Sequence, residues 1–251
     1  MASTAVAPKQ LAEGVHRLGN ELFNFYLVDE GGRATLVDAG LPGFRGQLEA
    51  HLRAIGRALG DIDAVILTHA HVDHVGIAEG VRRDAGARVH VHEADAEMAR
   101  TGRSHPREGG MAPYLRHRAT WRLLAAAARL GGMRPTKIAD VATFAGEDAL
   151  DVPGRPRIVA TPGHSPGHVA FHFPDRGVLI AGDALCTYNP LTGARGPQLM
   201  PRPFAWSNAQ ALASLGALEQ LEADVMLVGH GEPWTQGIRA AVAEVRERGA
   251  T

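Results

Sequence analysis

Thr68-His69-Ala70-His71-Val72-Asp73-His74 follows directly on the apolar run Val65-Ile66-Leu67, so three imidazoles and a carboxylate lie within six residues. The apolar run predicts a buried strand, and the polar stretch predicts a loop at the end of that strand. The first two histidines are two residues apart and project to the same side of extended backbone. The aspartate and the third histidine turn away from them as the chain enters a helix. This one segment could therefore serve two adjacent metal ions.

The same arrangement recurs three times later in the chain. Arg157 to Thr161 runs into Pro162-Gly163-His164, Val178 to Ala181 runs into Gly182-Asp183, and Val225 to Val228 runs into Gly229-His230-Gly231. Each of these strands is predicted to end on a possible metal ligand preceded by glycine, which permits close packing or a positive φ. Imidazole and carboxylate are ligands of zinc, and the absence of neighbouring cysteines argues against a closed structural site. A solvated, histidine-rich turn without metal is the alternative, and it does not explain the recurrence.

From about Glu13 to Gly237 the chain resembles the metallo-β-lactamase-fold superfamily of metal-dependent hydrolases. The resemblance is carried by His-x-His-x-Asp-His and three later ligands in the same order. It implies a first metal held by His69, His71 and His164, a second held by Asp73, His74 and His230, and a bridging carboxylate from Asp183. It also implies a four-layer αββα sandwich, whereas the pattern of elements alone supports a mixed α/β protein. Zinc is the expected metal, and iron or manganese are alternatives.

A site of this kind implies hydrolysis. Two cations about 3.5–4 Å apart would hold a bridging hydroxide and polarise the oxygen that becomes negative during attack. Asp73 would serve as general acid/base as well as ligand. No serine or cysteine nucleophile is required, and Cys186 has no neighbouring histidine in sequence. We therefore predict a binuclear hydrolase that acts on an ester, a thioester or a lactone.

Several branches of the resembled superfamily remain open at this stage. Zinc β-lactamases lack an aspartate at the position of Asp183, so lactam hydrolysis is disfavoured. Lactonases of acyl-homoserine lactones share the ligands and the Thr-Pro-Gly-His-Ser-Pro-Gly-His stretch, but usually have tyrosine where this chain has Cys186. Hydroxyacylglutathione hydrolases share the ligands too, yet their glutathione-binding helices have no evident counterpart after His230. The alternative outside the hydrolases is a persulfide dioxygenase with one iron. A non-catalytic binding protein is disfavoured because no ligand is missing.

Composition agrees with one domain over residues 1–251. A chain of 251 residues with 45% hydrophobic residues can bury a large core. The net charge of −1 gives no global field for nucleic acid or an anionic membrane, and no apolar run approaches the roughly 20 residues that span a bilayer. The single Cys186 and the lack of a signal-peptide pattern in Met1 to Gln10 predict a cytoplasmic protein. The expected partner is a small-molecule substrate.

Strands and helices are predicted to alternate around these motifs. The strands are Val15–Leu18, Phe23–Val28, Ala34–Val37, Asp63–Leu67 and Arg88–Val91, and the helices are Phe44–Leu59, Val75–Ala85, Ala94–Arg100, Ser207–Leu221 and Thr235–Arg248. Two stretches break this order. Residues 101–134 predict a helical insertion and possible lid, with Pro113 in its first turn and Gly131 at its end. Residues 186–206 are too long for an ordinary connection.

Substrate specificity is expected to reside in these two stretches. The apolar and aromatic side chains predicted to face the substrate are Met111, Tyr114, Trp121, Tyr188, Met200, Phe204 and Trp206. The alternative for the insertion is that Trp121 and Leu124 pack on the protein body while its many arginines lie in water, which argues against a charged substrate. His168, four residues after a predicted ligand, is expected to support the site rather than bind metal.

Overall fold

The computed structural model describes residues 9–146 and 149–249, so most of the stretch examined for a signal peptide lies outside the described residues. One sheet consists, in order, of β1 (Lys9–Ala12), β2 (Val15–Asn20), β3 (Phe23–Glu30), β4 (Arg33–Val37), β5 (Ile62–Ile66), β6 (Arg88–His92) and β7 (Ala142–Phe144). A second has the order β13 (Val225–Val228), β10 (Val178–Gly182), β9 (Val169–Phe173) and β8 (Arg157–Ala160). A short third sheet pairs β11 (Cys186–Tyr188) with β12 (Arg195–Gln198). The two larger sheets mix parallel and antiparallel pairs.

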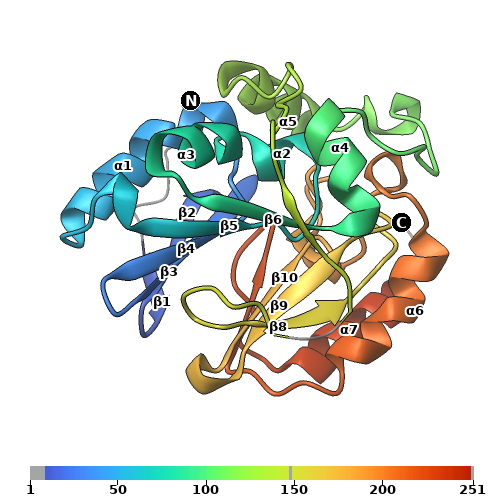
Figure 1. Cartoon of the computed structure of the whole chain (residues 1–251). Helices are drawn as coiled ribbons and strands as arrows, with labels where there is room; N and C mark the ends of the chain where they lie inside the picture. Colours follow the sequence, from blue (N-terminus) through green and yellow to red (C-terminus); the bar gives the residue numbers. More distant parts are fainter. Residues whose placement is uncertain (1–8, 147–148, 250–251) are drawn as a thin grey trace.

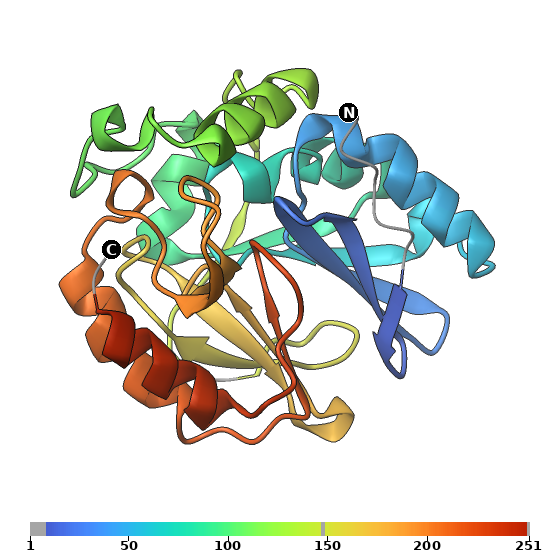
Figure 2. The same ribbon diagram turned by 180° about the vertical axis from the view of Figure 1, so that it is seen from behind.

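Helices cover the outer faces of both larger sheets (Figures 1 and 2). They are α1 (Arg45–Ala54), α2 (Val72–Val75), α3 (Ala78–Ala85), α4 (Ala96–Thr101), α5 (Arg118–Arg129), α6 (Asn208–Leu218) and α7 (Ile238–Arg248). α1 and α3 lie outside the seven-stranded sheet, and α6 and α7 lie outside the four-stranded sheet. The predicted αββα sandwich is confirmed. In the part of the chain that the structure describes, no helix has the length and apolar character needed to cross a bilayer.

Three apolar layers hold the sandwich together, because successive side chains of a strand point to opposite faces. In β3, Phe25 and Leu27 pack under the outer helices, whereas Tyr26 and Val28 pack between the two sheets. In β10, Leu179 and Ala181 face α6 and α7. The strands next to the site are thus buried on both faces, which fixes where their ends lie.

One predicted helix is divided beside the site. Val75–Ala85 was expected to be continuous, but α2 ends at Val75 and α3 starts at Ala78. Between them the Gly76 N–H donates to the carbonyl of Gly40 (2.7 Å) and the Ile77 N–H donates to the carbonyl of Ala39 (3.0 Å). These bonds to another segment replace bonds within the helix. They anchor α2, which carries two of the predicted ligands, to the loop after β4.

Other boundaries differ for local reasons. The helix predicted over Phe44–Leu59 ends at Ala54, because Gly56 takes a φ of 72° that an α-helix cannot continue. Pro113 lies in a separate 3₁₀ turn, Ala112–Tyr114, rather than in the first turn of α5. Gly131, with a φ of 82°, follows the end of α5 as predicted.

Candidate active site

The seven predicted ligands gather where strand ends of the two larger sheets meet. The segment after β5 supplies four of them, and the ends of β8, β10 and β13 supply one each. Side chains close enough to share an ion form three overlapping groups: His69, His71 and His164; His69, His74 and Asp183; and Asp73, His74 and His230. Segments far apart in the chain are therefore brought to one point by the packing of the sheets.

Asp183 lies at the centre of this cluster. Its Oδ2 is 3.3 Å from Nε2 of His164, 3.2 Å from Nε2 of His230 and 3.6 Å from Nε2 of His74. Within the first group, Nδ1 of His71 faces Nε2 of His164 at 2.8 Å. One carboxylate oxygen thus lies close to His164 of the first group and to His74 and His230 of the third, which is the position that a bridging ligand needs.

Neighbouring acceptors decide which nitrogen of two histidines is free. Nδ1 of His230 contacts the carbonyl of Leu22, and a carbonyl can only accept, so Nδ1 carries the proton and Nε2 keeps its lone pair. The Thr68 hydroxyl donates to the Asp38 carboxylate, so it accepts from Nδ1 of His69 at 3.0 Å. Nε2 of His69 is buried and has no hydrogen-bond partner in the described structure. A buried nitrogen without a partner is costly, and a metal ion would satisfy it.

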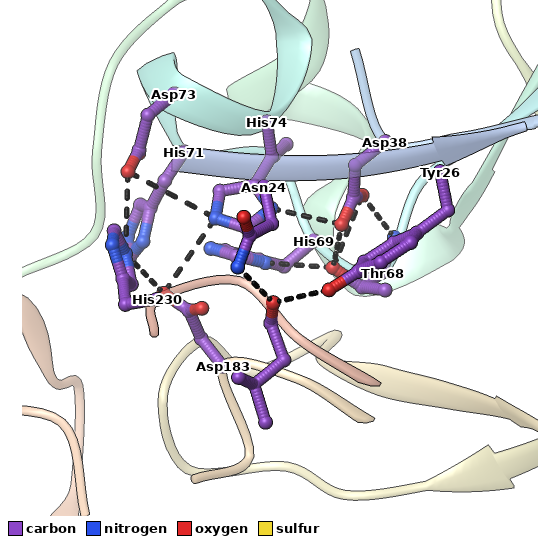
Figure 3. A network of polar contacts seen from close by, with 12 residues as sticks. Asn24, Tyr26, Asp38, Thr68, His69, His71, Asp73, His74, Asp183 and His230 are labelled. Carbon is purple, nitrogen blue, oxygen red and sulfur yellow. Dashed lines mark hydrogen bonds and ion pairs between the residues drawn. The ribbon is translucent and has the colours of Figure 1, made fainter. Parts of the chain in front are cut away.

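Asp38 orients the third histidine of the motif (Figure 3). Its Oδ2 is 2.9 Å from Nδ1 of His74, and its carboxylate also accepts from the backbone N–H of Thr68 (2.8 Å) and from the Thr68 hydroxyl. Asp38 is buried and has a φ of 59°, which is unusual for a residue other than glycine. The bond turns Nε2 of His74 towards Asp183 and Asp73. Carboxylates behind histidine ligands commonly fix the ring in this way.

His168 has both ring nitrogens engaged. Its Nε2 accepts from the Asp183 backbone N–H at 3.0 Å, so its Nδ1 carries a proton, which the Thr161 hydroxyl accepts at 2.8 Å. Burial lowers the pKa of His168 to about 4. No nitrogen remains for a metal, which agrees with the expectation that His168 supports the site. Its contact instead holds the backbone of Asp183.

Two glycines allow the strand ends to approach this closely, as the sequence predicted. A Cβ on Gly229 would lie 2.1 Å from Oδ1 of Asp183, and this distance is too short for any side chain at position 229. Gly182 has a φ of 53°, and a Cβ there would meet the Thr68 hydroxyl at 2.7 Å. Any larger residue at either position would move a strand end away from the cluster.

Burial and charge give the two halves of the cluster different protonation states. Burial lowers the pKa of His69 and His164 well below 6.5 and that of His71 to about 4, so this half is neutral, as metal ligation requires. Burial also opposes a charge on His74, but the carboxylates of Asp38, Asp183 and Asp73 raise its pKa well above 6.5. The second half therefore favours positive charge, which a proton or a metal cation can supply. The donor set fits divalent metal ions.

Asp95 ties together the two loops that carry the first group of histidines. This buried carboxylate accepts from the Ala70 N–H (3.2 Å), the Ser165 hydroxyl (2.6 Å) and the Gly167 N–H (2.8 Å). Nε2 of His105 lies 3.7 Å from its Oδ1. Asp95 therefore connects both ligand loops to the start of the 101–134 insertion.

A pocket of about 320 Å³ opens over the cluster. Its floor includes His71, Asp73, His164, Asp183 and His230, and its wall consists of Phe23, Leu41, Val72, Ser104, Arg107, Met111, Leu123, Leu124, Ala127, Gly132, Met133, Met200 and Phe204. Eight of the wall residues belong to residues 101–134, so the insertion forms much of the wall. α5 is anchored there: the Thr120 hydroxyl donates to the carbonyl of Leu191 at 2.9 Å, and Leu123 is buried.

The structure places only part of the predicted substrate set at this pocket. Met111, Met200 and Phe204 line the pocket, but Tyr114, Trp121, Tyr188 and Trp206 do not. Trp121 is 58% exposed and its indole N–H donates to the carbonyl of Leu115. Tyr188 is buried in the core under the outer helices, and Trp206 is 39% exposed. α5 turns its Leu124 side towards the cluster and its Trp121 side towards solvent.

Sequence reasoning missed Asp38, Asp95 and most of the pocket wall. A signal for Asp38 was present, because it follows directly on the apolar strand β4 as the predicted ligands follow theirs. Asp95 contacts residues that are 25 to 72 positions away in the sequence, so no local sequence pattern predicts these contacts. Leu41 and Phe23 were not among the predicted site residues.

The chain belongs to the Metallo-beta-lactamase superfamily, whose family model matches residues 22–230. A probable metallo-hydrolase, YflN, from Bacillus subtilis (strain 168) is 30% identical over 95% of this chain and 92% of that protein. The hydroxyacylglutathione hydrolase of Fuscovulum blasticum is 30% identical over 88% of this chain and 66% of that protein. Together with the superfamily match, these relatives show that the chain is a metal-dependent hydrolase.

Solved structures agree with this assignment. The metallo-beta-lactamase family protein TTHA1429 from Thermus thermophilus has a TM-score of 0.65 and 30% identity, covering 90% of this chain and 74% of that one. Rm3 metallo-beta-lactamase has a TM-score of 0.70 at 20% identity, covering 98% of this chain and 93% of that one. The second likeness shows the shared fold.

Proposed function

We propose that this protein is a binuclear metal hydrolase that cleaves an ester, a thioester or a lactone. The observation that carries the proposal is the position of Asp183, whose Oδ2 lies within 3.6 Å of His74, His164 and His230 at the floor of an apolar pocket. One group of histidines on each side of this oxygen supports two ions. We expect zinc, with iron or manganese as alternatives.

His69, His71 and His164 would hold one ion, and Asp73, His74 and His230 the other, with Asp183 shared. Two such ions, when bound, activate water and polarise the scissile carbonyl. Asp73 is the ligand best placed for proton transfer, because its side chain is partly exposed and lines the pocket, whereas Asp183 is buried. Its carboxylate can accept a proton from the attacking water and pass it to the leaving group.

The pocket supports the proposed substrate class. A volume of about 320 Å³ is at the lower end of ligand pockets, and its wall is mainly apolar. It suits a small to medium, partly apolar molecule rather than nucleic acid. The relative named hydroxyacylglutathione hydrolase supports a thioester in particular. The single Cys186 and the net charge of −1 support a cytoplasmic enzyme without nucleic-acid or membrane partners.

Metal analysis and a substrate panel test the proposal. We expect about two metal ions per chain after metal-supplemented expression, and turnover of aryl esters, acyl-lactones or acyl thioesters above phosphodiesters and a chromogenic cephalosporin. Faster turnover of phosphodiesters would overturn the substrate class and leave the metal assignment in place. One iron per chain with oxygen consumed on a persulfide substrate would instead establish the alternative, a mononuclear dioxygenase.

A further inference from the structure

Arg107 is an exposed cation in the pocket wall, and no described residue is its counter-ion. Of the described residues that line the pocket, it alone is a lysine or arginine, and its guanidinium makes no hydrogen bond or ion pair with any other described residue. The two carboxylates of the pocket are engaged elsewhere, since Asp73 and Asp183 face His230 at 3.4 and 3.2 Å. By contrast, Arg122 on α5 pairs with Glu21 at 3.0 Å.

The segment that carries Arg107 is held from both sides. The N–H of the next residue, Glu108, donates to the carbonyl of Ala205 at 2.9 Å, and its carboxylate accepts from the Asn208 N–H at 3.1 Å. On the other side, His105 lies 3.7 Å from the buried Asp95. The backbone at Arg107 is therefore ordered before any ligand arrives, which lowers the entropy lost on binding.

The chemistry of the wall defines what such a cation would bind. The side chains of Met111, Leu124, Met200 and Phe204 are apolar, and Ser104 lines the pocket close to Arg107 in sequence. A guanidinium presents its N–H groups in a fork that matches the two oxygens of a carboxylate or phosphate. A ligand that satisfies all parts of the pocket has a scissile bond over the metal ligands, an apolar body, and an anionic group at Arg107.

We infer that Arg107 is a specificity residue and that the preferred substrate is an ester, thioester or lactone bearing a separate anionic group, either carboxylate or phosphate. This inference rests on the proposed function. It departs from the expectation of an uncharged substrate, which followed from treating all arginines of residues 101–134 as solvated. Arg107 and Arg103 are both exposed and lie in the same segment, but only Arg107 lines the pocket.

Matched substrate pairs test the inference. The probes are 4-nitrophenyl pentanoate, the monoester of glutarate with the same carbon chain, and the phosphorylated analogue of equal length. In the metal-replete enzyme, kcat/KM should be higher for one of the anionic esters than for the neutral one. Arg107→Gln should lower that ratio about 10-fold, through KM, as expected for one charge-assisted contact. Arg107→Lys should restore part of it, and the control Arg103→Gln should leave the ratio unchanged.

Binding measurements separate this inference from the proposed hydrolysis. Calorimetry of glutarate, of a phosphorylated acid of equal length and of pentanoate needs no turnover, and subtracting pentanoate removes the contribution of the carboxylate at the metals. Suppose that no ester is hydrolysed but either dianion binds more tightly than pentanoate, and that this difference disappears in Arg107→Gln. The proposed hydrolysis would then be wrong, and the anion site at Arg107 would still be supported. Neither dianion binding more tightly than pentanoate, or equal losses in Arg107→Gln and Arg103→Gln, would overturn the anion site.

Discussion

The floor and the wall of the pocket differ in how firmly their side chains are held and in their polarity. On the floor, the predicted ligands lie at the ends of strands buried on both faces. Asp38, Thr68 and His168 hold them with hydrogen bonds to their rings or their backbone, and Asp95 holds the neighbouring residues Ala70, Ser165 and Gly167. The wall comes largely from residues 101–134 and from the segment after Asp183, and its side chains are mainly apolar, with Arg107 as the one lysine or arginine among the described lining residues. The floor should therefore determine the reaction and the wall the choice of substrate.

The largest expected effect is at the centre of the floor. Asp183→Asn keeps the size of the side chain but removes the charge that faces three histidines, so metal content should fall below two ions per chain and kcat/KM by about 10³-fold or more, since several kcal/mol of transition-state stabilisation are lost. Elemental analysis and steady-state kinetics measure both. Glu247→Gln, an exposed carboxylate remote from the site, is the matched control. Full metal content with normal kinetics in Asp183→Asn would remove Asp183 from the site.

A smaller loss of metal affinity is expected at Asp38, which contacts the predicted ligand His74. Asp38→Asn should weaken metal affinity about 10- to 100-fold, the usual effect of removing a carboxylate behind a ligand histidine. Asparagine tolerates a positive φ, so the backbone strain at this position is not changed and the effect reports the charge. Competition with a chelator measures the affinity. An affinity equal to that of the parent protein would mean that the contact between Asp38 and His74 does not tune the site.

Changes in the wall should alter recognition while metal content stays the same. Leu124→Ala removes part of the pocket lining, so we expect KM to rise about three-fold or the ranking of acyl chains to change. Trp121 is exposed to solvent on the same helix, so Trp121→Ala should change KM less than about two-fold. Kinetics on esters of increasing chain length compare the two. A larger effect at Trp121 would mean that α5 turns its other side to the substrate in solution.

The smallest effect concerns the link between wall and floor. The buried carboxylate of Asp95, whose Oδ1 lies 3.7 Å from Nε2 of His105, raises the pKa of His105 above 6.5, and a raised pKa in the folded state means that protonation favours folding. This contribution is complete below about pH 6.5 and disappears as the pH rises through the higher folded value. His105→Gln should therefore lower Tm more at pH 6 than at pH 9. A loss in Tm that is independent of pH would show that the ion pair does not contribute.

Sequence alone predicted the floor far better than the wall. Each predicted ligand follows an apolar run, and that local signal survives because the strands are buried whatever the rest of the chain does. β1 and β7 were not predicted, since three- or four-residue edge strands carry little alternation. Of the predicted apolar stripe on α5, Leu124 lines the pocket and Trp121 is exposed. Trp121 and Leu124 are neighbours on one apolar stripe, and which of them is covered depends on segments far away in the chain.

Anomalous diffraction from crystals of the zinc-replete protein tests the central claim most directly. We predict two peaks, one among His69, His71 and His164 and one among Asp73, His74 and His230, with the Asp183 carboxylate between them. A single peak in the first group, with none at the second under excess zinc, would contradict the binuclear site.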